Sequence, residues 1–149
     1  MTCTTRLRHD PIDAAAVIAA ASAPRNGAVI LFLGTVREHN DGRAVTGIEY
    51  SAYEAMAERE LADIAREGSA RFGDADVAIE HRLGELELGE ASVAIAVGSP
   101  HRDDAYAVSR WVIEELKRRV PIWKREGYVD GTREWVNAAG VASAPGVAP

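Results

Sequence analysis

The sequence has 149 residues, a formal net charge of −6 and a single cysteine, Cys3. This length suits one domain with its own core, and 47% hydrophobic with 27% charged residues is typical of globular proteins rather than disordered chains. One cysteine excludes an internal disulfide, and the net acidity argues against general nucleic-acid binding, although a local basic patch can still collect a small anion.

No segment of the sequence predicts a membrane span or a secretory signal. The longest apolar run, AVILFLG at residues 28–34, has the length of a buried strand and not the roughly 18 residues of a membrane helix. The N-terminal stretch MTCTTRLRHD lacks the apolar centre of a signal peptide. We therefore expect a cytoplasmic protein with neither a membrane nor a nucleic acid as partner.

The first part of the chain reads as strand, helix and strand. Residues 4–9 fit a short strand. Asp10 and Pro11 suit the N-cap and first position of an alanine-rich helix, which we expect to end before Pro24. Residues 28–36 are apolar and β-branched enough for a central strand.

The middle of the chain predicts a loop, a strand and a helix. The segment REHNDGR, residues 37–43, reads as a polar loop with an Asp-Gly turn, and residues 45–53 read as a strand. Residues 54–72 predict a helix because apolar residues recur there at helical spacing, namely Met56, Leu61, Ile64 and Ala65.

Two further strands, residues 76–83 and 92–97, are joined by GELELGE, whose two glycines suit a turn or bulge. Residues 103–120 have the apolar stripe of an amphipathic helix, and Pro121 ends it. Residues 122–128 and 133–136 can pair as a hairpin around Asp-Gly.

The predicted fold class is α+β, because helices and strands are mixed and at least one strand pair is joined directly. We expect a single domain over residues 1–137. The tail AAGVASAPGVAP, residues 138–149, is small-residue and low-complexity, and we expect it to be disordered.

Residues 116–125, LKRRVPIWKR, concentrate five of the 17 basic residues of an acidic chain. Lys117 falls on the last helical turn and Lys124 lies beyond the proline. Because Pro121 ends the helix and forces Val120 toward an extended conformation, the chain can turn back and bring the two lysines together. Their repulsion would lower the pKa of one and make it a base or nucleophile.

A structural explanation of the same cations stays open at this stage. Cations at a helix C-terminus complement the helix dipole, which accounts for Arg118 and Arg119. It does not account for Lys124 and Arg125, which lie beyond the helix.

Two other segments offer groups for an anion. SPHRDD, residues 99–104, lies where a strand ends and a helix begins, so His101 and Arg102 could add donors to the helix N-terminus; an ordinary Ser or Asp cap with a solvated Arg is the alternative. Arg37 follows the central strand and could clamp a phosphate or carboxylate, whereas we interpret His39 as a polar loop residue.

Four segments in this order, FLGTVREHN, HRLGELELGE, SPHRDDAYA and ELKRRVPIWKRE, resemble the large, catalytic subunit family of molybdopterin synthase. The resemblance runs from about residue 27 to residue 135. It implies an α/β hammerhead-like fold with an additional antiparallel β subdomain. Gly98 departs from the family pattern, in which Ser or Ala is expected.

The resemblance also implies an activity. In that family a sulfurtransferase inserts two sulfur atoms into cyclic pyranopterin monophosphate to form the dithiolene of molybdopterin. The sulfur arrives as a thiocarboxylate on the C-terminal Gly-Gly of a small ubiquitin-like partner, and a homodimer of large subunits forms the centre of a heterotetramer. The pterin is substrate and product, so neither a cofactor nor a metal is implied.

Carried over by position, the resemblance assigns catalytic roles to Lys117 and Lys124. It assigns substrate binding to a second set of residues: Thr35, Val36, Arg37, His101, Arg102, Arg125 and Glu126. On the residues alone, we expect Glu85, Glu87 and Glu90 to be a solvated acidic face rather than a metal site.

Two readings from other classes compete with the enzyme. A regulatory module could use the basic cluster only to sense an anion. An adaptor could grip an acidic tail, with binding that weakens in salt and with no chemical change in either component.

Overall fold

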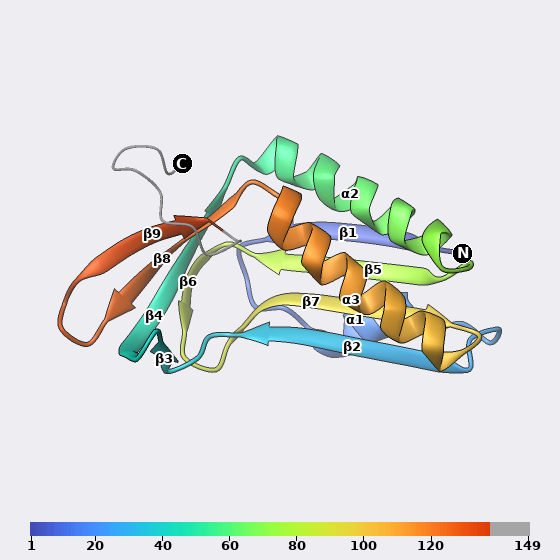
Figure 1. Ribbon diagram of the computed structural model, residues 1–149, viewed down its shortest axis with the longest axis horizontal. Coiled ribbons are helices and arrows are strands. Elements are labelled where there is room, and N and C mark those ends of the chain that lie inside the picture. Colours follow the sequence, from blue (N-terminus) through green and yellow to red (C-terminus); the bar gives the residue numbers. More distant parts are fainter. Residues whose placement is uncertain (138–149) are drawn as a thin grey trace.

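The computed structural model describes residues 1–137, so the expectation for residues 138–149 lies outside the described part of the chain. None of the helices in this part is long and apolar enough to cross a membrane. The described residues form two sheets and three helices (Figure 1).

The first sheet has four strands in the order β1 (Cys3–Arg8), β5 (Asp76–Arg82), β7 (Ala91–Ser99) and β2 (Ala28–Thr35). β1 runs parallel to β5, and the other two pairs are antiparallel. The predicted strands at residues 4–9, 28–36, 76–83 and 92–97 are thus confirmed to within two residues at each end.

The helices α2 (Glu54–Arg71) and α3 (Arg102–Arg119) cover one face of this sheet, and the short α1 (Ala14–Ala20) covers the other (Figure 1). The alternation of side chains along β5 explains the division. Val77 and Ile79 point to the larger core beneath α2 and α3, whereas Ala78 joins the smaller core beneath α1.

The second sheet is antiparallel and lies beyond one end of the first (Figure 1). Its strands in order are β3 (His39–Asn40), β4 (Arg43–Ala52), β8 (Ile122–Tyr128) and β9 (Arg133–Asn137). A further strand, β6 (Gly84–Glu87), pairs with β4 on the edge opposite to β8. The α+β class with an additional antiparallel sheet is confirmed, as is the hairpin of β8 and β9.

The start of the first helix was predicted wrongly. Asp13, and not Asp10, is the N-cap of α1, and its carboxylate accepts hydrogen bonds from the backbone N–H groups of Ala15 and Ala16. The Asp10 carboxylate instead binds the Arg8 guanidinium at 3.1 Å, so the side chain that was expected to cap the helix has another partner.

Two predicted loops contain strands. Gly84 and Gly89 have φ of 95° and 84°, and the segment between them pairs with β4 because Leu86 is buried there. The predicted Asp-Gly turn is present, with Asp41 and Gly42 both at positive φ, but it closes the β3–β4 hairpin rather than an irregular loop.

Candidate active site

The reversal of the chain at Pro121 follows the prediction. α3 ends at Arg119, and Val120 is extended, with φ −78° and ψ 127°. The backbone then enters β8, whose Lys124 lies opposite Tyr50 of β4. The proline therefore converts a helix end into a strand that passes beside it.

Lys117 and Lys124 line one pocket of about 300 Å³ between the two sheets and α3. Side chains alternate along β8, so Lys124 and Glu126 share the pocket face and Arg125 points to the other. The polar residues that complete the lining are Thr35, Arg37, His39, Asn40, Tyr50 and Ser92.

Lys117 lines this pocket from the last turn of α3. None of the ion pairs within residues 1–137 involves it, although the residue as a whole is exposed. Desolvation of its ammonium lowers its pKa, and the positive charges of Lys124 and Arg37 lower the pKa further. The repulsion expected from the sequence thus acts in the same direction as desolvation, which is the larger cause. A lysine of this kind has more neutral amine at a given pH and can exchange protons.

Lys124 has a different environment. Its ammonium lies 3.1 Å from Oε1 of Glu126, a carboxylate that is only 1% exposed. Oε2 of Glu126 accepts hydrogen bonds of 2.6 Å from the Asn40 amide and of 2.6 Å from the Tyr128 hydroxyl. Burial disfavours the charged form of Glu126, but these bonds and Lys124 outweigh it and lower the pKa of the carboxyl. The two lysines therefore differ: among residues 1–137, Lys124 pairs with a carboxylate and Lys117 does not.

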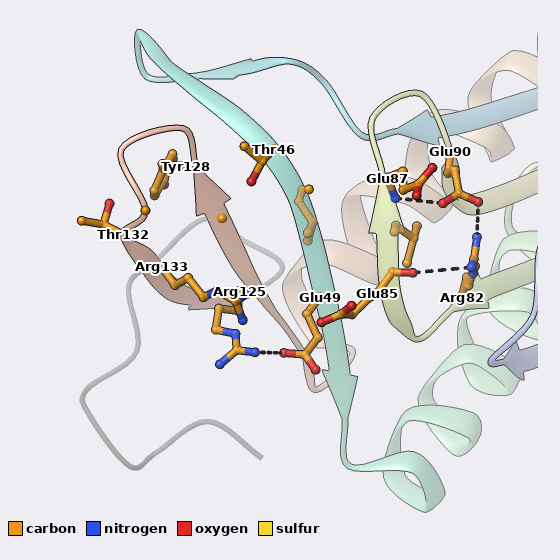
Figure 2. A pocket seen from close by; sticks show the side chains of 15 residues that line it. Thr46, Glu49, Arg82, Glu85, Glu87, Glu90, Arg125, Tyr128, Thr132 and Arg133 are labelled. Atoms are coloured by element: carbon orange, nitrogen blue, oxygen red, sulfur yellow. Dashed lines mark hydrogen bonds and ion pairs between the residues drawn. The ribbon is translucent and has the colours of Figure 1, made fainter.

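A larger cavity of about 560 Å³ opens on the opposite face of the second sheet (Figure 2). Two of its three arginines are paired: Arg125 points to Glu49, with 2.5 Å between Nη2 and Oε1, and Arg82 points to Glu90, with 2.6 Å between Nη1 and Oε2. Four glutamates and three arginines line this larger cavity, whereas three cations and one glutamate line the smaller pocket. The smaller pocket is therefore the better candidate for an anionic substrate.

Arg82 also donates to the backbone carbonyl of Glu85, and it thus spans the turn around β6. Glu90 is part of this arrangement, because it also accepts a hydrogen bond from the backbone N–H of Glu87. No group of three or more His, Cys, Asp or Glu side chains within residues 1–137 could hold a metal ion.

The structure brings only part of the predicted set together. Thr35, Arg37 and Glu126 join the two lysines in the pocket. The Val36 side chain is 4% exposed, and its backbone pairs with Gly89 and Glu90 at the turn before β7. Arg125 belongs to the larger cavity because of the alternation along β8.

His101 and Arg102 lie at the opposite end of α3 from Lys117. His101 is the N-cap of α3 and makes no side-chain capping bond, and Arg102 starts the helix. Both are exposed. Arg102 and Lys117 are 15 residues apart on one straight helix, which separates them by roughly 22 Å. Neither His101 nor Arg102 is among the residues of one chain that line the pocket.

Sequence reasoning missed Asn40 and Tyr128, because only the folded chain shows which side chains reach Glu126. It also missed a signal in the composition: only two of the 17 basic residues are lysines, and both line this pocket. Arginine cannot release its proton in proteins, whereas lysine can. Both residues of the Lys and Arg set that can exchange a proton therefore line the same pocket.

His81 lies in the core beside the pocket and packs edge-on against Tyr50, with 5.1 Å between ring centroids. Burial lowers its pKa to about 4, and the nearby positive charge of Lys117 contributes to the decrease. His81 is therefore neutral at pH 7 and adds no charge to the pocket.

Known proteins are similar to this chain over most of its length. The MoaE protein family matches residues 7–119. The molybdopterin synthase catalytic subunit of Halalkalibacterium halodurans is 45% identical over 130 residues, covering 87% of this chain and 83% of that protein. The subunit of the same name from Emericella nidulans is 45% identical over 132 residues, covering 89% of this chain and 62% of that protein. The crystal structure of molybdopterin synthase from Staphylococcus aureus superimposes with a TM-score of 0.83 at 37% identity, covering 88% of this chain and 95% of that one.

Proposed function

Because this chain belongs to the MoaE protein family and is a molybdopterin synthase catalytic subunit, we propose that the pocket between Lys117 and Lys124 is its site of sulfur transfer. The observation that carries the proposal is the arrangement of the two lysines: Lys117 is unpaired among residues 1–137 and has a lowered pKa, and it lies beside Lys124.

The proposed substrate is cyclic pyranopterin monophosphate, and the proposed sulfur donor is a thiocarboxylate at the C-terminal Gly-Gly of a small ubiquitin-like partner. Both are anions. The three cations of the pocket, Lys117, Lys124 and Arg37, suit a phosphate and an acyl group held side by side. The pterin is substrate and product, and the proposal needs no further cofactor.

In the proposed reaction the sulfur of the thiocarboxylate forms a bond to a carbon of the pterin side chain, and a carbon–oxygen bond at that carbon breaks. Water then hydrolyses the acyl–sulfur bond, which releases the partner with a C-terminal carboxylate and leaves the sulfur on the pterin. Lys117 exchanges a proton at its amine and, as an ammonium, stabilises the negative charge that develops. Lys124 orients the substrate, because its ammonium is fixed by Glu126 at 3.1 Å. Arg37 and Thr35 bind the anionic groups at the rim.

We also propose a homodimer of this chain at the centre of a heterotetramer, with one small partner at each end. The substrate-binding parts of His101, Arg102, Arg125 and Val36 rest on the family resemblance, since one chain does not bring these side chains into the pocket.

The test is a reconstituted sulfur transfer. The purified protein is mixed with the thiocarboxylated partner and pyranopterin monophosphate, and the dithiolene product and the loss of the thiocarboxylate are followed together. We expect both changes. Partner binding that weakens with salt, without a chemical change, would favour the adaptor. Binding of the pterin alone, without turnover, would favour the anion-sensing module.

A further inference from the structure

The two oxygens of the Glu126 carboxylate have different partners. Oε1 faces the ammonium of Lys124 at 3.1 Å, and Oε2 accepts from the Asn40 amide and the Tyr128 hydroxyl. Because the side chain is buried, its orientation is set by these partners and not by solvent.

Tyr128 is itself held rigidly. It is 7% exposed, and the guanidinium of Arg43 lies 3.5 Å from the centre of its ring. Arg43 is fixed in turn by Asp130 at 3.2 Å and Thr132 at 2.5 Å in the β8–β9 turn. Burial and the hydrogen bond to the Glu126 carboxylate raise the pKa of Tyr128 to about 12, so its hydroxyl stays a donor across the working pH range.

We propose that Tyr128 is a positioning residue for sulfur transfer, which holds Lys124 in place through the carboxylate of Glu126. The chain of contacts runs from the β8–β9 turn through Arg43, Tyr128 and Glu126 to the ammonium in the pocket. The inference rests on the proposed function of Lys124. It adds that the β8–β9 hairpin, and not only the residues that line the pocket, determines the position of the Lys124 ammonium.

This chain of contacts from Arg43 through Tyr128 and Glu126 to Lys124, which we call the relay, predicts a specific pH effect. The Tyr128 hydroxyl is one of the groups that lower the pKa of Glu126, so its removal raises that pKa. Glu126 then becomes neutral at a higher pH, and Lys124 loses its charged partner there. Other charged or titratable groups act on Glu126 in the variant and the wild type alike: Lys117, Arg37, His39 and Tyr50 in the pocket, Arg43 on β4 and Glu134 opposite on β9.

The variant Tyr128→Phe removes the hydroxyl and leaves the ring beneath Arg43. We expect kcat to fall roughly tenfold, in line with the loss of a hydrogen bond to a charged group, with KM for the partner changed by less than about twofold. The acid limb of the pH profile of kcat moves to higher pH. Tyr106→Phe, at a tyrosine 64% exposed on α3, is the matched control and leaves both quantities unchanged.

A second readout does not need activity. Carbon-13 NMR of the glutamate carboxyls follows the titration of Glu126, which Glu126→Gln assigns, and [ε-¹³C]lysine gives only two lysine signals. We expect a raised Glu126 pKa and a shifted Lys124 signal in Tyr128→Phe. If Tyr128→Phe fails to fold by circular dichroism, Asn40→Ala removes the other donor and is expected to have the same effects.

The outcomes separate this inference from the proposed function. An unchanged Glu126 titration in a folded variant overturns the relay, whatever the activity. An unchanged pH profile alongside a tenfold loss of kcat also overturns it, because general damage would explain the loss. A wild-type protein without sulfur transfer whose Glu126 titration still responds to Tyr128→Phe contradicts the proposed function and supports the relay.

Discussion

At the scale of single residues, the pocket depends on the difference between lysine and arginine. Arg118 and Arg119, beside Lys117 on α3, are paired with carboxylates, Arg118 with Glu115 at 2.6 Å and Arg119 with Glu60 at 3.1 Å. Lys117 is the cation of this turn that has no such partner within residues 1–137. Ion pairs thus account for the two arginines, whereas Lys117 lines the pocket.

The first prediction concerns the charge of Lys117. The positive charge of Lys124 lowers the pKa of Lys117, so Lys124→Ala raises it toward the ordinary value, although desolvation keeps part of the shift. The measurement is a pH titration of the [ε-¹³C]lysine signal by NMR. A Lys117 signal that titrates identically in both proteins would contradict the proximity of the two ammonium groups.

The second prediction concerns Arg37. It lines the pocket rim and bonds only loosely to Asn40, at 3.3 Å, so its guanidinium is free to bind the phosphate of the proposed substrate. Arg37→Ala is expected to raise KM for the pterin roughly tenfold and to change kcat much less. Steady-state kinetics with the partner saturating measures this. A fall in kcat at constant KM would show that Arg37 acts on the transition state instead.

At the scale of elements, most of the secondary structure could be predicted. The amphipathic stripe of α3, the apolar runs of β2 and β7 and the Asp-Gly turn are properties of neighbouring residues. β6 and the start of α1 could not be predicted. β6 exists because its backbone pairs with β4, which is far away in the sequence, and α1 starts at Asp13 because Arg8 occupies Asp10.

The third prediction belongs to the contact between α1 and β7. A Cβ atom at Gly98 would meet the carbonyl oxygen of Ala21, at the end of α1, and the amide of Asn26. The departure of Gly98 from the family pattern thus matches a close approach of backbones. Gly98→Ala is expected to lower the free energy of unfolding by about 1–3 kcal/mol, measured by urea denaturation. An unchanged midpoint would mean that the end of α1 moves away without cost.

At the scale of the whole molecule, one buried carboxylate joins the residue before β1 to the segment between α1 and β2. Asp76, 2% exposed, accepts hydrogen bonds from the Thr2 backbone at 2.5 Å and the Asn26 amide at 2.7 Å, and it pairs with Arg25. Burial favours the neutral acid, but these partners outweigh it and lower the pKa of Asp76.

The fourth prediction follows from this lowered pKa. Asp76 contributes stability that is fully present above its unfolded pKa, 3.8, and that is lost as the pH falls through the lower folded pKa. Asp76→Asn is expected to reduce the free energy of unfolding by about 1–3 kcal/mol at neutral pH and less in acid. Denaturation at several pH values measures this. Asp74→Asn, at an exposed position two residues away, is the control, and an equal loss in both variants would contradict the role of Asp76.

The candidate site could be predicted in part for the same reason as the fold. The lysines on either side of Pro121 are close in sequence, so the reversal that joins them is a local event. Asn40 reaches Glu126 from 86 residues away, and Lys124 lies beside Tyr50 only because β8 pairs with β4. Contacts of this kind need the assembled sheets.

The most direct test of the account is the rate of sulfur transfer by three variants beside the wild type. Lys117→Ala removes the amine, Lys117→Arg keeps a charge that cannot release its proton, and Arg118→Ala removes the adjacent cation, which points to Glu115 and not to the pocket. The account predicts a loss of about a hundredfold or more in both Lys117 variants, with Arg118→Ala near the wild type. Full activity in Lys117→Ala would contradict the central claim that this lysine carries the chemistry.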